Sequence, residues 1–255
     1  MNDKIVPLLP ARTLRPDELA RLAKELLDDN VPTFNPHQTK ITNPQNYLIL
    51  PSKTHGNYSY PDLIVGTTRL SLDEEVKKAA EKLNLNLKNT GQENNGTGYI
   101  GGNISWEQAL KLNLSLDSFT LNLRQYLDFL KMLKSGKAFY ADGIKADKAS
   151  LNNVLDEILT ARNPYRAEWL DADFKFIDNK IHINYDHNLV NNILTPGKTE
   201  LLEKCLMNDK KIDLDDLLVN STYQGLPKKD VKSGSLYYCF PKSDNNSVAR
   251  FNANS

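Results

Sequence analysis

Net charge, long hydrophobic runs and cysteine are all scarce in this chain of 255 residues. Its 32 basic and 32 acidic side chains cancel, and no block of like charge is long enough to attract a nucleic acid. The apolar stretch near the N-terminus is broken by Pro7 and Pro10, so it is too short for a signal peptide or a membrane span. We therefore expect a soluble, cytoplasmic protein that binds neither nucleic acid nor membrane.

Cysteine is limited to Cys205 and Cys239, which lie in unrelated contexts. Such a pair indicates neither a disulfide framework nor a CxxC metal site. Cys205 falls on a predicted amphipathic helix, which favours a buried structural thiol. The serines lack the G-x-S-x-G pattern of a nucleophile elbow. No nucleophilic enzyme is therefore indicated, and no cofactor is expected apart from the metal considered below.

Helices and short strands are predicted from the spacing of apolar residues and from capping and turn residues. The predicted helices cover 16–29, 120–136, 147–163, 195–208 and 211–221, with one more starting at Ser71. The predicted strands cover 47–51 and 62–65, two runs within 167–187 joined by a turn at 178–180, and 236–240 and 248–251. Asp142-Gly143 predicts a tight hairpin. Together these predicted helices and strands indicate an α+β fold in which amphipathic helices pack on small antiparallel sheets.

Three regions follow from this pattern. Residues 1–118 form an N-terminal α+β region with a glycine- and asparagine-rich loop at 88–103. Residues 119–190 form a core of helix, hairpin, helix and hairpin. Residues 191–255 end in a further predicted hairpin, made by the strands at 236–240 and 248–251.

The stretch NPYRAEWLDADF, residues 163–174, combines a helix-breaking Asn-Pro with three carboxylates. On an extended strand Asp171 and Asp173 share one face, and His182 and Asp186 share a face of the returning strand. Carboxylates and imidazole are common ligands of divalent metals, so these four residues could form a metal site. The simpler interpretation is a two-stranded ribbon with one solvated side.

A second pattern, Gly96 to Gly101, matches GxGxxG and is followed by Asp117 about twenty residues later. In a dinucleotide site this motif directly follows a buried strand of a parallel sheet. Here polar residues and glycine precede it, so a flexible loop is favoured over nucleotide binding at Gly96–Gly102.

Four segments together resemble a known group of proteins. They are NPYRAEWLDADF, CLMNDKKIDLDDLL, QGLPKKDVKSGSLYYCFPK and SVARFNANS. Their resemblance, over residues 120–255, is to uncharacterised proteins of small archaeal and bacterial genomes. The C-terminal region of that group resembles the C-type-lectin-like targets of diversity-generating retroelements. The resemblance implies that the last hairpin begins a lectin-like binding domain that continues past Ser255. It carries no catalytic motif.

The leading expectation is a non-enzymatic binding or scaffold protein with a protein or other macromolecular partner. Its interaction surface is expected near the C-terminal hairpin, at Tyr237, Tyr238, Phe240, Arg250 and Phe251. The alternative is a metal-dependent hydrolase in which Asp171, Asp173, His182 and Asp186 hold a divalent ion that lowers the pKa of bound water. Nucleotide binding at the glycine-rich segment is a weaker alternative.

Overall fold

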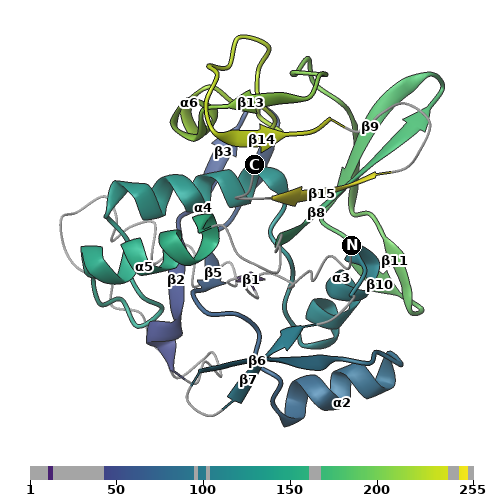
Figure 1. The fold of residues 1–255 in the computed structure, drawn as a ribbon. Coiled ribbons are helices and arrows are strands. Elements are labelled where there is room, and N and C mark those ends of the chain that lie inside the picture. Colours follow the sequence, from purple (N-terminus) through teal and green to yellow (C-terminus); the bar gives the residue numbers. More distant parts are fainter. Residues whose placement is uncertain are drawn as a thin grey trace.

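Five α-helices and six small sheets make up the part of the chain that the computed structural model describes (Figure 1). The described residues are 11–13, 43–94, 97–101, 104–160, 168–240 and 247–251. Every strand pair within these ranges is antiparallel. The predicted α+β class is confirmed, and the predicted helix at 16–29 lies outside the described residues. None of the helices within these ranges is long and apolar enough to cross a membrane.

The helices are α2 (Glu74–Lys82), α3 (Trp106–Ser115), α4 (Leu123–Ser135), α5 (Lys148–Leu159) and α6 (Leu214–Val219), with a 3-10 turn at Pro44–Asn46. The strands of the first half are β1 (Ala11–Thr13), β2 (Tyr47–Leu50), β3 (Lys53–His55), β4 (Tyr58–Tyr60), β5 (Leu63–Gly66), β6 (Lys88–Asn94) and β7 (Thr97–Gly101). Those of the second half are β8 (Glu168–Ile177), β9 (Lys180–Tyr185), β10 (Asn188–Val190), β11 (Ile193–Thr195), β12 (Lys198–Leu201), β13 (Lys210–Ile212), β14 (Leu236–Tyr238) and β15 (Ser247–Phe251).

The largest sheet has the strand order β12-β9-β8-β15. β8 and β9 are joined by the two residues Asp178 and Asn179, both with positive φ, which is the backbone of a type I′ hairpin turn. The seven residues from Glu168 to Phe174 are all buried. Alternate residues belong to different clusters, since Leu170, Ala172 and Phe174 join the main core whereas Trp169 packs near α3. The predicted solvated side of this ribbon is therefore wrong, because α3 covers it.

Helix α4 is the centre of the main core. Seven consecutive residues of this helix, from Arg124 to Leu130, are buried. A helix buried on all sides must be enclosed by other elements, and α4 contacts β2, α5, α6 and β8. The core that surrounds it contains Leu48 and Val65 as well as Phe240 and Phe251. All three predicted regions thus contribute to one core.

Capping residues were predicted correctly for some helices and shifted for others. Asp147 caps α5, and Gly136 ends α4 in the left-handed conformation, as expected. Two helices start two residues later than predicted: the N-cap of α2 is Asp73, and that of α4 is Asn122 in a capping box with Gln125. In both cases a second capping residue lies nearby, and tertiary packing selects the later one.

Two C-terminal predictions are wrong. Residues 195–208 contain strand β12 rather than a helix, because β12 pairs with β9 along the sheet edge. The predicted C-terminal hairpin does not form either, since β14 pairs with β13 and β15 pairs with β8. β15 is held there by its buried residues, of which Phe251 packs on Tyr126 of α4 with ring centroids 5.2 Å apart. Pairing with distant strands has overridden the local turn signal.

The glycine-rich segment also differs from the prediction. β6 and β7 form an antiparallel ribbon over most of the span that was expected to be a flexible loop. Dinucleotide binding requires a parallel sheet behind the glycines. The antiparallel pairing of β6 with β7 offers no such sheet.

Two glycines with positive φ provide a matched test of backbone packing. A Cβ on Gly225 would lie 2.7 Å from the amide nitrogen of Arg124, and φ is +89° there. On Gly136, where φ is +68°, the nearest atom would be a carbon of the Lys148 side chain at 3.6 Å. We expect Gly136→Ala to lower the free energy of unfolding by about 1–2 kcal/mol, the cost of a left-handed non-glycine residue. Gly225→Ala should cost about 3 kcal/mol or more, because backbone atoms must also move. Urea denaturation of both variants checks this, and equal losses would contradict it.

Candidate functional site

A buried cluster of ionisable side chains lies where β8 and β9 meet α3. Asp171 and Asp173 lie on the same face of β8, as the alternation of strand residues requires. After β9 the backbone of Asp186 adopts a left-handed conformation with φ of 54°. This bend returns the next residue, His187, to β8, where its backbone N–H donates to Asp171 Oδ2 at 2.9 Å.

The imidazole of His187 bridges the two carboxylates. Its Nδ1 lies 2.5 Å from Asp171 Oδ1 and its Nε2 lies 3.3 Å from Asp173 Oδ1. Burial by itself would lower the pKa of His187, but the two carboxylates outweigh burial and raise the pKa to about 9. Burial would raise the pKa of Asp173, yet the hydrogen bond from His187 and the charge of Lys175 hold it below its usual value. At neutral pH the cluster is therefore an imidazolium between two carboxylates, which we call the acid–histidine triad.

Trp106 of α3 packs against the triad. Its ring lies 5.2 Å from the His187 ring, edge to face, and its indole N–H donates to the carbonyl of Leu170 at 2.8 Å. Both ring nitrogens of His187 face carboxylates, so neither is open to a substrate. The triad thus stabilises the junction of sheet and helix, and general base catalysis by His187 has no geometric support.

A polar cavity of about 450 Å³ lies beside the triad. Its walls include Asp171 and His187 together with Asp186, and the aromatic rings of Tyr58, Tyr60 and Phe119. Asp186 Oδ1 accepts a hydrogen bond from Asn122 at 3.1 Å, and Lys198 Nζ lies 3.9 Å from Oδ2. Burial and the charge of Asp171 raise the pKa of Asp186.

The four predicted metal ligands do not form one group. Asp171, Asp173 and Asp186 lie near one another around His187. His182 is placed opposite Lys175 in the sheet, and its Nδ1 faces the carbonyl of Lys180 at 3.3 Å. Among the described residues no set of three His, Cys, Asp or Glu side chains is arranged to hold a metal ion. The sequence did contain the decisive residue, since His187 directly follows Asp186, but the left-handed bend that returns it to β8 gives no sequence signal.

A second buried polar network surrounds Asp128 on α4, and sequence analysis did not detect it. The carboxylate accepts hydrogen bonds from Tyr60 at 2.7 Å and Arg124 at 3.0 Å, and contacts His55 Nε2 at 2.6 Å and Lys53 Nζ at 2.9 Å. Burial would raise the pKa of Asp128, but the charge of Arg124 and the hydrogen bonds lower it. In the sequence, the only sign of this network is the i, i+4 spacing of Arg124 and Asp128, which allows an ion pair on one helix face. The network attaches the β3–β4 ribbon to α4.

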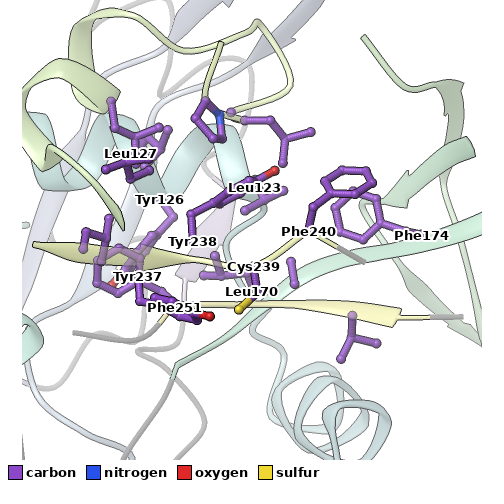
Figure 2. A pocket seen from close by; sticks show the side chains of 18 of the residues that line it. Leu123, Tyr126, Leu127, Leu170, Phe174, Tyr237, Tyr238, Cys239, Phe240 and Phe251 are labelled. Carbon is purple, nitrogen blue, oxygen red and sulfur yellow. The ribbon is translucent and has the colours of Figure 1, made fainter. Parts of the chain in front are cut away.

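An apolar cavity of about 420 Å³ lies between α4, β8, β14 and β15 (Figure 2). Four of the predicted binding residues line it: Tyr237, Tyr238, Phe240 and Phe251. The side chain of the fifth, Arg250, lies outside the described part of the chain. Figure 2 shows Phe240 beside Phe174 of β8, with ring centroids 6.3 Å apart.

Few polar groups face this apolar cavity, and most of them have partners in the protein. The Tyr238 hydroxyl donates to the carbonyl of Leu206 at 3.0 Å, and the Trp169 indole N–H lies 3.3 Å from the carbonyl of Ile104. Burial raises the pKa of Tyr238, so its hydroxyl stays neutral. Cys239, an exposed free thiol, also lies on the wall. The cavity therefore offers apolar contact and very little hydrogen bonding.

Comparisons with known proteins give no relative: no family model matches the chain, and neither a curated protein nor a solved structure matches it. The resemblance to lectin-like retroelement targets therefore stays a prediction, and the chemistry of the two cavities is argued from their geometry.

Removing the imidazole should strongly destabilise the protein. In His187→Ala two buried carboxylates would lose their common partner, and breaking a buried ion pair in this way costs about 3–5 kcal/mol. The triple variant His187→Ala, Asp171→Asn, Asp173→Asn removes all three charges and should recover part of that loss. Chemical denaturation gives both values. A triple variant less stable than His187→Ala would contradict the charge argument.

The same cluster predicts how stability depends on pH. The pKa of His187 rises from 6.5 to about 9 on folding, so its contribution is complete below pH 6.5 and is lost as the pH rises through 9. The pKa of Asp173 falls below 3.8 on folding, so its contribution is present above pH 3.8 and is lost at lower pH. The difference in unfolding free energy between wild type and His187→Ala should thus be larger at about pH 6 than at about pH 10. A difference that stayed constant would show that His187 is not charged in the folded protein.

Proposed function

We propose that this protein is a non-enzymatic binding protein that takes a small apolar ligand into the cavity between α4, β14 and β15. The observation that carries the proposal is the cavity itself, about 420 Å³ in volume and walled by aromatic and aliphatic side chains. Pockets that hold small molecules commonly have volumes of roughly 300–1,000 Å³ and a mainly apolar lining. A close-packed interior rarely leaves so much space unfilled.

The character of the walls defines the ligand class. A cavity with mainly apolar walls gives water few hydrogen-bonding partners, so an apolar molecule gains by entering it. The wall hydroxyl of Tyr238 is bonded within the protein, which leaves aromatic and aliphatic contact as the main source of affinity. A small aromatic or aliphatic molecule suits these walls better than a sugar or a nucleotide.

The position of the cavity agrees with the sequence-based expectation of binding near the C-terminal strands. β14 and β15 belong to different sheets, and the cavity lies between them. The expected macromolecular partner would have to contact this region from outside, for example at the exposed ring of Tyr237. The resemblance to lectin-like proteins implies a binding role for the same segment.

The alternative of a metal-dependent hydrolase receives less support from the geometry. Both oxygens of Asp171 already bond to His187. An ion at this site would have to displace an imidazolium that two buried carboxylates hold in place. His182 would also need to leave its position on β9.

The test fills the cavity by mutation. Ala249 is buried on the cavity wall, so Ala249→Leu adds three carbon atoms where the ligand would sit. We expect the neutral fluorescent probe N-phenyl-1-naphthylamine to bind wild-type protein at one site. The variant should bind it at least about tenfold more weakly, a change of roughly 1.4 kcal/mol. Fluorescence titration measures both affinities.

Controls separate cavity binding from adhesion to apolar surface. Val219 on α6 is exposed, and Val219→Ser removes exposed apolar area without touching the cavity. Its probe affinity should equal that of wild type. Ala249→Leu should keep or exceed wild-type stability, because it fills empty space. Equal probe binding by Ala249→Leu and wild type would refute the proposal.

A further inference from the structure

The polar cavity beside the acid–histidine triad has features that the proposed function does not use. Its charge is unbalanced: His187 is matched by both Asp171 and Asp173, which leaves that triad with a net negative charge. Asp186 adds a further carboxylate to the wall. This carboxylate accepts a single hydrogen bond from a side chain, and Lys198 lies 3.9 Å away, beyond hydrogen-bond distance. Burial and the charge of Asp171 raise the pKa of Asp186, and the hydrogen bond from Asn122 opposes them.

A buried hydrogen-bond donor lies in the same wall. The Tyr58 hydroxyl oxygen accepts from Asn122 Nδ2 at 2.6 Å and from Gln125 Nε2 at 2.9 Å. The capping box of α4 fixes both amides, because their oxygens accept backbone N–H groups and only their NH₂ groups remain to donate. A phenol oxygen has two acceptor positions and one proton. With both positions used, the proton must be donated elsewhere, and no described residue accepts it.

Tyr58 is only 2 % exposed and lines the cavity. A buried donor without an acceptor is costly, so the arrangement suits a bound molecule that supplies an oxygen. Burial raises the pKa of Tyr58, which keeps the proton on its hydroxyl.

The chain already places one ammonium group next to two residues of the wall, Tyr58 and Asp186. Lys198 Nζ lies 4.8 Å from the centre of the Tyr58 ring and 5.8 Å from that of Tyr185, which is the geometry of a cation–π contact. The same ammonium is the one that approaches Asp186. The carboxylate and ring faces at this edge of the cavity therefore favour an organic cation.

We propose that the polar cavity binds a small primary amine that carries a hydroxyl or carbonyl oxygen next to its ammonium group. The ammonium bonds to Asp186 and lies against the tyrosine rings. The neighbouring oxygen accepts the proton of Tyr58. The cavity volume of about 450 Å³ accommodates a ligand of this size.

Two variants test the two contacts, and thermal denaturation checks that each is folded, since Tyr58→Phe removes the acceptor of the Asn122 and Gln125 amides. Asp186→Asn keeps the shape of the side chain, and asparagine tolerates the left-handed backbone at this position. Since Asp186 accepts one hydrogen bond from a side chain and Lys198 lies beyond hydrogen-bond distance, the variant should be about as stable as wild type. Tyr58→Phe removes the hydroxyl and retains the ring. Asp178→Asn, at an exposed left-handed turn residue, is the matched control.

The probes are ethanolamine, which has both groups, ethylamine, which lacks the oxygen, and acetate, which lacks the ammonium. Binding is measured by NMR chemical-shift titration to about 50 mM, well above the roughly millimolar Kd that a few contacts provide. We expect ethanolamine to bind most tightly, ethylamine more weakly and acetate not at all. Asp186→Asn should weaken ethanolamine binding at least about tenfold, because hydrogen bonds between charged groups are strong. Tyr58→Phe should reduce the affinity for ethanolamine to that for ethylamine, and Asp178→Asn should change neither.

A further variant removes Lys198, whose ammonium group competes with the ligand for Asp186. Lys198→Met removes the internal ammonium and should strengthen ethanolamine binding several-fold. Three results would overturn the proposal: no shifts with either amine in wild type and in Lys198→Met, equal binding by Asp186→Asn, or binding of Mg²⁺ or Ca²⁺ at these residues in preference to the amines. The last result would support the metal alternative instead.

Discussion

The burial of β8 on both faces is the constraint on which the rest of this structure depends. A strand enclosed by helices on two sides normally has an apolar sequence, yet this one contains Asp171 and Asp173. Their charges can be buried only with a partner, and His187 supplies the positive charge between them. The left-handed bend at Asp186 exists because the chain must return His187 to β8. The same bend places Asp186 beside the polar cavity.

Helix α4 also contains buried charged residues that need partners. Its first two turns, from Arg124 to Leu130, are buried on all sides, and they carry Arg124 and Asp128 one turn apart. Their mutual ion pair is extended by Tyr60 and His55 from the β3–β4 ribbon. Each of the two central elements thus contains buried charges that are matched by residues from distant parts of the chain. Both cavities border β8: Asp171 lines the polar one, and Trp169, Leu170 and Phe174 line the apolar one.

Local features of this fold were predictable from sequence, and long-range pairings were not. Apolar periodicity and capping residues identified α5 and α6, and the turn at Asp178 and Asn179 identified the β8–β9 hairpin. β14 and β15 were identified as strands, but their partners were wrong, because a turn signal says nothing about which distant edge is available. The alternation along β8 correctly grouped Asp171 with Asp173. It could not show that α3 covers them, since the covering residue, Trp106, is far away in sequence. The aromatic residues of the C-terminal strands line one cavity, but that cavity also depends on α4, and no sequence signal indicated it.

The pairing of β15 with β8 also affects the order in which the protein is assembled during synthesis. β8 and β9 are adjacent in sequence and can pair as soon as both have left the ribosome. β15 is made much later, after β9 to β14, so one edge of β8 stays open throughout that interval. Contacts between distant segments are slow to form, and an open strand edge is a site for incorrect pairing. The nascent chain is therefore most vulnerable to aggregation while residues between β9 and β15 are being translated, and a chaperone that shields strand edges would act in that interval.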